Sequence, residues 1–143
     1  MEEIQKFNKE INDLRCLKLN IHELRKIYDI IDNNEMKKSL KSIIMISDKI
    51  YKEVVVNTEK LYKIRNFNNY YIVTVKKVLK QYINLKDKKI VNRESEELYN
   101  KIETFIVKVS NSFEKIYISL FEEEVLDIDA EIKVMMNELK IKG

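Results

Sequence analysis

His22 and Cys16 are the first side chains to test for chemistry, since they are the only histidine and the only cysteine. Nucleophilic catalysis needs a serine, cysteine or threonine within hydrogen-bonding reach of a base such as histidine. Cys16 lies six residues before His22 on a stretch that we expect to be helical, and this spacing places them on different faces. We therefore predict no catalytic residue and interpret His22 as a surface or boundary side chain.

The densest group of side chains able to bind a hard metal ion lies near the C-terminus. Its members are Glu122, Glu123, Glu124, Asp127, Asp129 and Glu131. Carboxylate oxygens suit calcium or magnesium, but the segment lacks the glycine and the spacing of an EF-hand loop. The alternative interpretation is that these acids stabilise the start of a helix, where the helix dipole favours negative charge. We predict no cofactor and no metal, and Asp127 and Asp129 are the candidate ligands that the sequence offers.

Glycine and proline are almost missing, because the 143 residues include no proline and one glycine, Gly143. A glycine-rich phosphate-binding loop is therefore excluded. Clusters of cysteine and histidine that would bind zinc are absent as well. The remaining composition is 45% hydrophobic and 36% charged, which is typical of a folded chain. With so few turn-forming residues, we expect long helices packed on one another.

Apolar residues at three- and four-residue spacing predict four long helices and a short final one. The first is expected from about residue 2 to 31, where Asp32, Asn33 and Asn34 end it. The second begins near Glu35, with Asn34 as its N-cap, and we expect a break in the β-branched residues 54–58. The third runs from residue 58 or 66 to 86.

The fourth helix is expected to follow Asn92 as its N-cap and to reach Leu120. The final helix is expected to start at Asp127, its predicted N-cap. The apolar positions expected to face inward in the third and fourth helices are Phe67, Tyr71, Val75, Val78, Tyr82 and Leu85, and Leu98, Ile102, Phe105, Val109, Phe113, Ile116 and Leu120. The apolar face of the final helix is supplied by Ile128, Ile132, Met135, Met136 and Leu139. Such spacing places each set along one side of its helix.

These elements predict an all-α protein, an antiparallel bundle of about four long helices with coiled-coil character and a short C-terminal helix. We expect one domain over residues 1–143, in which helix 1–34 can extend beyond a bundle formed by 35–143. The same spacing serves packing within one chain and pairing with a second copy. The sequence therefore leaves the oligomeric state open, with a homo-oligomer as one expectation.

The charge is divided unevenly along the chain. Residues 1–91 carry 20 Lys and Arg against 12 Asp and Glu, whereas residues 92–143 carry 7 against 12. We favour attraction between the two parts over a basic face for an acidic partner, because acids and core residues interrupt the basic groups. We expect no nucleic-acid binding, and peripheral contact of residues 1–91 with anionic membranes stays an alternative. The free thiol, the acidic start and the short apolar runs predict a cytoplasmic protein without a transmembrane segment.

Two segments of the second half follow a pattern found in bacterial proteins. The first has Asn66-Phe67, then Tyr70-Tyr71, then Leu79 and Tyr82, and the second has Leu120-Phe121, an acidic stretch and a run from Asp127 to Ile132. In order and spacing they resemble the 5-bromo-4-chloroindolyl phosphate hydrolysis proteins, also called XpaC-like, best over residues 63–143. The positions that carry the resemblance are Arg65, Phe67, Tyr70, Tyr71, Tyr82, Leu120, Phe121, Asp127 and Asp129.

The resemblance implies a helical cytoplasmic protein linked to toxic-anion (tellurite-type) resistance or envelope stress, together with TelA-like proteins. Val73 stands where members often have proline, which favours a straighter third helix. We therefore predict a non-enzymatic interaction or adaptor protein, whose partner is a TelA-like protein or a second copy. The alternative is a metal-assisted phosphate-ester hydrolase, as the family name suggests, with Asp127 and Asp129 binding the metal.

Overall fold

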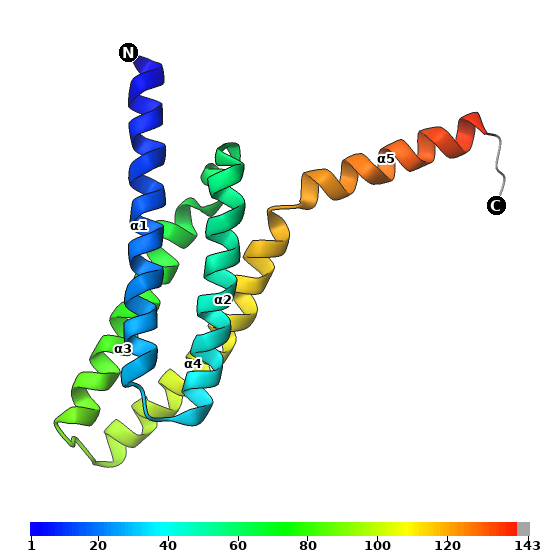
Figure 1. Ribbon diagram of the computed structural model, residues 1–143. Helices are drawn as coiled ribbons and strands as arrows, with labels where there is room; N and C mark the ends of the chain where they lie inside the picture. Colours follow the sequence, from blue (N-terminus) through cyan, green and yellow to red (C-terminus); the bar gives the residue numbers. More distant parts are fainter. Residues whose placement is uncertain (140–143) are drawn as a thin grey trace.

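The computed structural model describes residues 1–139, and every regular element in that range is a helix (Figure 1). The all-α prediction is confirmed. The elements are α1 (Glu2–Ile30), α2 (Asn34–Val56), a 3-10 helix η1 (Thr58–Ile64), a π-helix η2 (Phe67–Tyr71), α3 (Ile72–Asp87), α4 (Arg93–Ser119) and α5 (Glu122–Glu138). Within residues 1–139 no helix is both long and apolar enough to cross a membrane.

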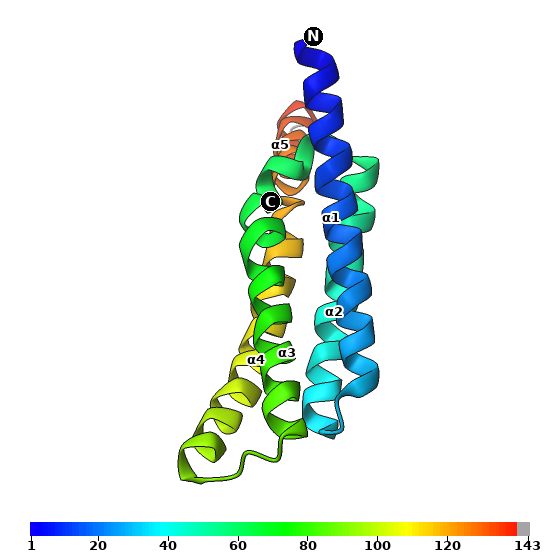
Figure 2. The same ribbon diagram turned by 90° about the vertical axis from the view of Figure 1, so that its left-hand side faces the viewer.

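Helices α1 to α4 alternate in direction and form an antiparallel bundle (Figures 1 and 2). Helix α1 packs on α2 and α3, while α2 packs most extensively on α4. Of the four neighbouring pairs, α3 and α4 have the least contact, and their ends spread apart towards the connection that joins them (Figure 2).

The core is made by the inward faces of these four helices and of η1 and η2. Helix α2 buries apolar residues at steps of three, four and seven, since Met36, Leu40, Ile43, Ile50 and Val54 are all buried. Burying one such side chain is worth about 1.5–3 kcal/mol. The expected break also occurs, because α2 ends at Val56 and the chain continues as η1. The three- and four-residue spacing was therefore a good guide to this element.

The third helix departs from its predicted register at η2. Tyr71 was expected to face inward, but 42% of its surface is exposed, whereas the next residue, Ile72, is fully buried. The reason is the wide π turn, in which the Ile72 N–H donates to the carbonyl oxygen of Phe67, five residues earlier. Ile72, rather than Tyr71, therefore lies below Phe67 on the inner face.

Asparagine side chains cap the starts of α2 and α4. The Asn33 Oδ1 accepts a hydrogen bond from the Met36 N–H at 3.0 Å, so the N-cap of α2 is Asn33 and not the predicted Asn34. Asn92 caps α4 as predicted, with its Oδ1 2.9 Å from the Ser95 nitrogen. Ser95 Oγ accepts in return from the Asn92 N–H at 2.8 Å, which completes a capping box.

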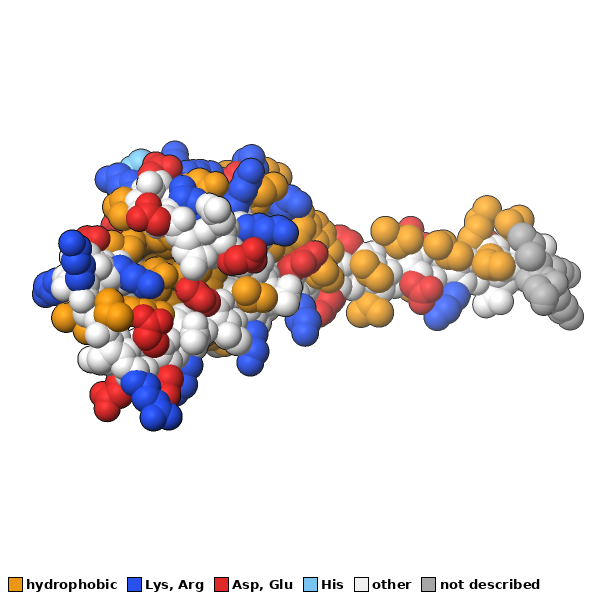
Figure 3. Space-filling model, turned by 90° about the horizontal axis from the view of Figure 1, so that it is seen from below, with side chains coloured by type: hydrophobic (Ala, Val, Ile, Leu, Met, Phe, Trp, Pro, Cys, Tyr) orange, Lys and Arg blue, Asp and Glu red, His pale blue; other side chains and the backbone are white. Residues whose placement is uncertain are grey.

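The prediction for the final helix is wrong in its start. Helix α5 begins at Glu122, five residues before the predicted cap, so Asp127 lies in its second turn. Three acids in the first turn suit the positive end of the helix dipole, which explains the earlier start. None of the α5 residues is buried, and the helix points away from the bundle (Figures 1 and 3). The apolar face predicted for this helix is therefore exposed.

Candidate functional site

The side chains singled out for chemistry are not brought together. His22 and Cys16 are both exposed on α1. Asp127 and Asp129 are exposed on α5 two residues apart, a spacing at which helical side chains do not face each other. The Asp129 Oδ2 instead pairs with the Lys133 Nζ at 2.8 Å. Within residues 1–139 no three side chains of histidine, cysteine, aspartate or glutamate are placed to hold a metal ion.

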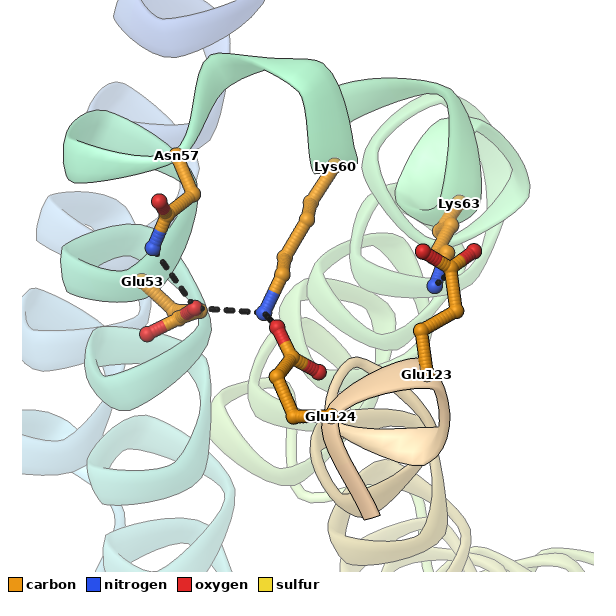
Figure 4. A network of polar contacts seen from close by, with 6 residues as sticks. All are labelled: Glu53, Asn57, Lys60, Lys63, Glu123 and Glu124. Atoms are coloured by element: carbon orange, nitrogen blue, oxygen red, sulfur yellow. Dashed lines mark hydrogen bonds and ion pairs between the residues drawn. The ribbon is translucent and has the colours of Figure 1, made fainter. Parts of the chain in front are cut away.

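A polar network at the start of α5 is the most organised cluster of charges (Figure 4). The Lys60 Nζ lies 2.6 Å from the Glu124 Oε1 and 2.7 Å from the Glu53 Oε2. Asn57 Nδ2 donates to the same Glu53 oxygen at 2.9 Å. Beside it, Lys63 pairs with Glu123 at 3.3 Å. The network therefore joins α2, η1 and the first turn of α5.

Lys60 is buried, with 7% of its surface exposed, and the structure compensates its charge. Burial by itself lowers the pKa of Lys60, but hydrogen bonds with Glu124 and Glu53 outweigh it and leave that pKa raised. The same bond from Lys60 lowers the pKa of Glu124. The Lys60 ammonium also lies 4.6 Å from the centre of the Phe121 ring, a cation–π distance. The raised pKa of Lys60 and the lowered pKa of Glu124 both favour the charged forms, and this ion pair joins the first turn of α5 to η1.

Sequence reasoning missed this network. The sequence analysis placed Glu123 and Glu124 before the predicted helix start at Asp127, and their lysine partners lie some sixty residues earlier in the chain. No pattern in the sequence marked Lys60 as buried, since Asn57, Thr58 and Glu59 come directly before it. Its partner could not be read from spacing, because the pairing depends on how α4 returns to η1.

The first segment of the pattern described above forms η2 and the wall of a small hollow. The hollow measures about 350 Å³ and lies between α1, η1 and η2, with Arg65 and Asn69 in its lining. Asn68 is buried there and donates through Nδ2 to the Asp13 carbonyl oxygen at 3.0 Å. Its Oδ1 has no partner among the described residues. Three basic and three acidic side chains line this hollow, so their formal charges cancel.

Several positions of the family pattern have packing roles. Phe67 contacts Phe113 edge to face with ring centres 4.8 Å apart, and Tyr82 contacts Tyr99 at 5.6 Å. Burial raises the pKa of Tyr82, and the negative charge of Glu103 raises it further. Leu120 is fully buried. These contacts join α3 or η2 to α4.

Four other positions of the pattern, Tyr70, Tyr71, Asp127 and Asp129, are exposed. They therefore have no role in the core. Exposed side chains in a shared pattern are available for contacts with another molecule.

The exposed face of α5 is a continuous apolar stripe, which we call the α5 stripe. It consists of Val125, Ile128, Ile132, Met135 and Leu139, each more than half exposed. Steps of three and four residues align them on one side of the helix. Figure 3 shows hydrophobic side chains along the projecting helix. Because water-exposed apolar area of this kind is unfavourable, the stripe is a candidate interaction surface.

A family model described as "5-bromo-4-chloroindolyl phosphate hydrolysis protein" matches residues 3–135. The chain belongs to this family. No curated protein and no solved structure gives a significant match. The family match extends from α1 into α5, so it is wider than the resemblance recognised over residues 63–143. In this member of the 5-bromo-4-chloroindolyl phosphate hydrolysis protein family, the family region therefore includes both the bundle and most of the projecting helix.

Proposed function

We propose that this chain is a non-enzymatic adaptor that binds a partner protein through the α5 stripe. The observation that carries the proposal is a stripe of five apolar side chains left open on a helix whose first turn is fixed by Lys60. A helix held in place before binding loses less conformational freedom on association. The three- and four-residue steps of the α5 stripe also suit coiled-coil pairing with another helix.

The chemistry of α5 describes the partner. Residues 122–139 carry seven carboxylates against one lysine, so the partner surface is expected to be apolar with a basic rim. The family resemblance favours a TelA-like protein as this partner and toxic-anion resistance in the cytoplasm as its setting. A second copy of the chain is the other partner that the same surface suits.

The test compares two substitutions on the same helix. Ile132→Lys places a charge in the middle of the stripe, whereas Val134→Lys places it on an equally exposed position off the stripe. Binding to the TelA-like protein is measured by calorimetry, and self-association by sedimentation velocity at micromolar concentration. We expect Ile132→Lys to weaken binding about tenfold or more and Val134→Lys to leave it nearly unchanged. If the unaltered chain binds neither, or both variants behave alike, the proposal is wrong.

A second candidate function follows from the description of the family, which names hydrolysis of a phosphate ester. Here Asp127 and Asp129 would bind a metal ion that activates water. The test is turnover of 5-bromo-4-chloroindolyl phosphate by highly purified protein with added magnesium, manganese or calcium. Turnover that follows the protein through purification and disappears in Asp127→Ala and Asp129→Ala would favour the hydrolase. Turnover no higher than buffer would leave the adaptor as the function to pursue.

A further inference from the structure

The open side of the bundle carries an apolar groove between α3 and α4, which we call the α3/α4 groove. Two hollows of about 600 and 480 Å³ follow one another along these helices. Both are lined by Thr74 and Phe105, so they form one continuous channel. The groove lies where the bundle has its weakest helix contact.

The groove is lined by side chains whose spacing predicted burial. Six predicted core positions are only half-buried or exposed here, and all of them line the groove: Tyr71, Val78, Leu85, Leu98, Phe105 and Ile116. Their spacing along α3 and α4 is the spacing of a helix packing seam. An additional helix would bury them, and α5 of the same chain does not lie on them.

The α4 rim of the groove is basic. Lys101 and Lys115 line it, and Lys108 lies between them at seven-residue steps, which is about 10 Å of helix rise per step. None of these lysines forms an ion pair within residues 1–139, and neither hollow is lined by a carboxylate. The groove therefore favours an acidic amphipathic helix.

Helix α5 has the complementary features. Glu131 and Glu138 flank the α5 stripe on one side, again seven residues apart, and match the step between neighbouring α4 lysines. The 17 residues of α5 extend about 25 Å. The part of α4 from Leu98 to Ile116 that lines the groove has nearly the same length. The apolar face, the charge spacing and the length of α5 therefore all match the α3/α4 groove.

The groove of the same chain is not the place where α5 lies. Lys60 and Lys63 hold the first turn of α5 on η1, and folding α5 back along α4 would break both ion pairs. We propose that α5 of a second copy occupies the α3/α4 groove, and that two copies exchange α5 reciprocally in a closed dimer. A stable protein–protein interface typically buries about 1,600 Å² in total, and the exchange supplies two helix-in-groove contacts toward such an area. This inference rests on the proposed adaptor function and names its partner.

Reversing the charges of the groove in one variant, and those of α5 in another, tests whether two copies exchange α5. One variant carries Lys101→Glu with Lys108→Glu, and the other carries Glu131→Lys with Glu138→Lys. In a homodimer of either variant the groove and the incoming helix have like charges, whereas a mixture of the two pairs opposite charges at both contacts. All four residues are exposed, so neither variant alters the core. A control variant, Lys18→Glu with Lys26→Glu, makes the same change in net charge on α1.

Sedimentation velocity and light scattering at micromolar concentration are the measurements. We expect a dimer for the unaltered chain and the control, a dissociation constant raised about tenfold or more for each variant alone, and a restored 1:1 dimer on mixing. A monomeric unaltered chain overturns the inference. The inference also fails if the variant with Lys101→Glu and Lys108→Glu still dimerises. If the chain is monomeric but Ile132→Lys abolishes TelA-like binding, the adaptor function stands and this inference alone fails.

Discussion

Buried and half-buried polar side chains connect α1 to α3 through a small number of direct contacts. The Lys76 Nζ lies 2.6 Å from the Glu23 Oε2 and 2.8 Å from the Asn20 Oδ1. Lys80 reaches the same carboxylate at 3.5 Å. The hydrogen bond from Lys76 lowers the pKa of Glu23 below its usual 4.5, although partial burial opposes the shift. Glu23 is therefore held charged by the folded structure.

This shift predicts how stability depends on pH. The unfolded chain takes up the Glu23 proton near pH 4.5, before the folded chain does, so the stabilisation is present above that pH. It is lost as the pH falls further, through the lower folded pKa. We expect Glu23→Gln to lower the free energy of unfolding near neutral pH and to make its decline in acid shallower. Urea unfolding between about pH 7 and pH 3 measures both.

Glu114→Gln is the matched control, since Glu114 is exposed and has no ion pair within the described chain. The free energy of unfolding of this control should decline in acid as that of the unaltered protein does. If Glu23→Gln declines with the same slope as Glu114→Gln, the contact with Lys76 does not stabilise the charged carboxylate.

At the level of elements, spacing and capping residues predict most of the helices. The ends of α1 and the Asn92 cap agree with the sequence because they depend on neighbouring residues alone. The η2 turn does not, since a π turn inserts one residue into the helical repeat and changes which side chain faces inward. The Lys60 network and the direction of α5 also depend on distant parts of the chain, which spacing does not describe.

The π turn predicts an asymmetry between two neighbouring residues. Ile72→Ala leaves a cavity in the core and should cost about 2–5 kcal/mol. Tyr71→Ala removes an exposed ring and should cost less than about 1 kcal/mol in the monomer. Urea unfolding of both variants at low protein concentration measures the difference. Equal costs, or a larger cost for Tyr71→Ala, would mean that the helix keeps the regular repeat that the sequence predicts.

At the level of the whole molecule, the acidic charge of the second half is displaced from the bundle. Residues 92–143 are net acidic, and seven of their acids lie on α5. The expected attraction between the two parts is present at Lys60 and Lys63, which pair with the first turn of α5. Beyond that turn, the acids of α5 extend away from the basic bundle (Figure 3). The fold therefore separates a stable bundle from a projecting acidic helix.

This separation predicts that the bundle folds without α5. A chain that ends at Phe121 keeps every buried residue of the described structure, and Lys60 keeps its contact with Glu53. Its free energy of unfolding, measured with urea, should differ from that of the full chain by less than about 1 kcal/mol under monomeric conditions. A chain that ends at Ser112 also loses the buried Phe113 and Leu120 and should be strongly destabilised. If removing α5 alone costs as much as that second shortening, α5 packs on its own bundle, and the stripe is part of the core rather than a binding surface.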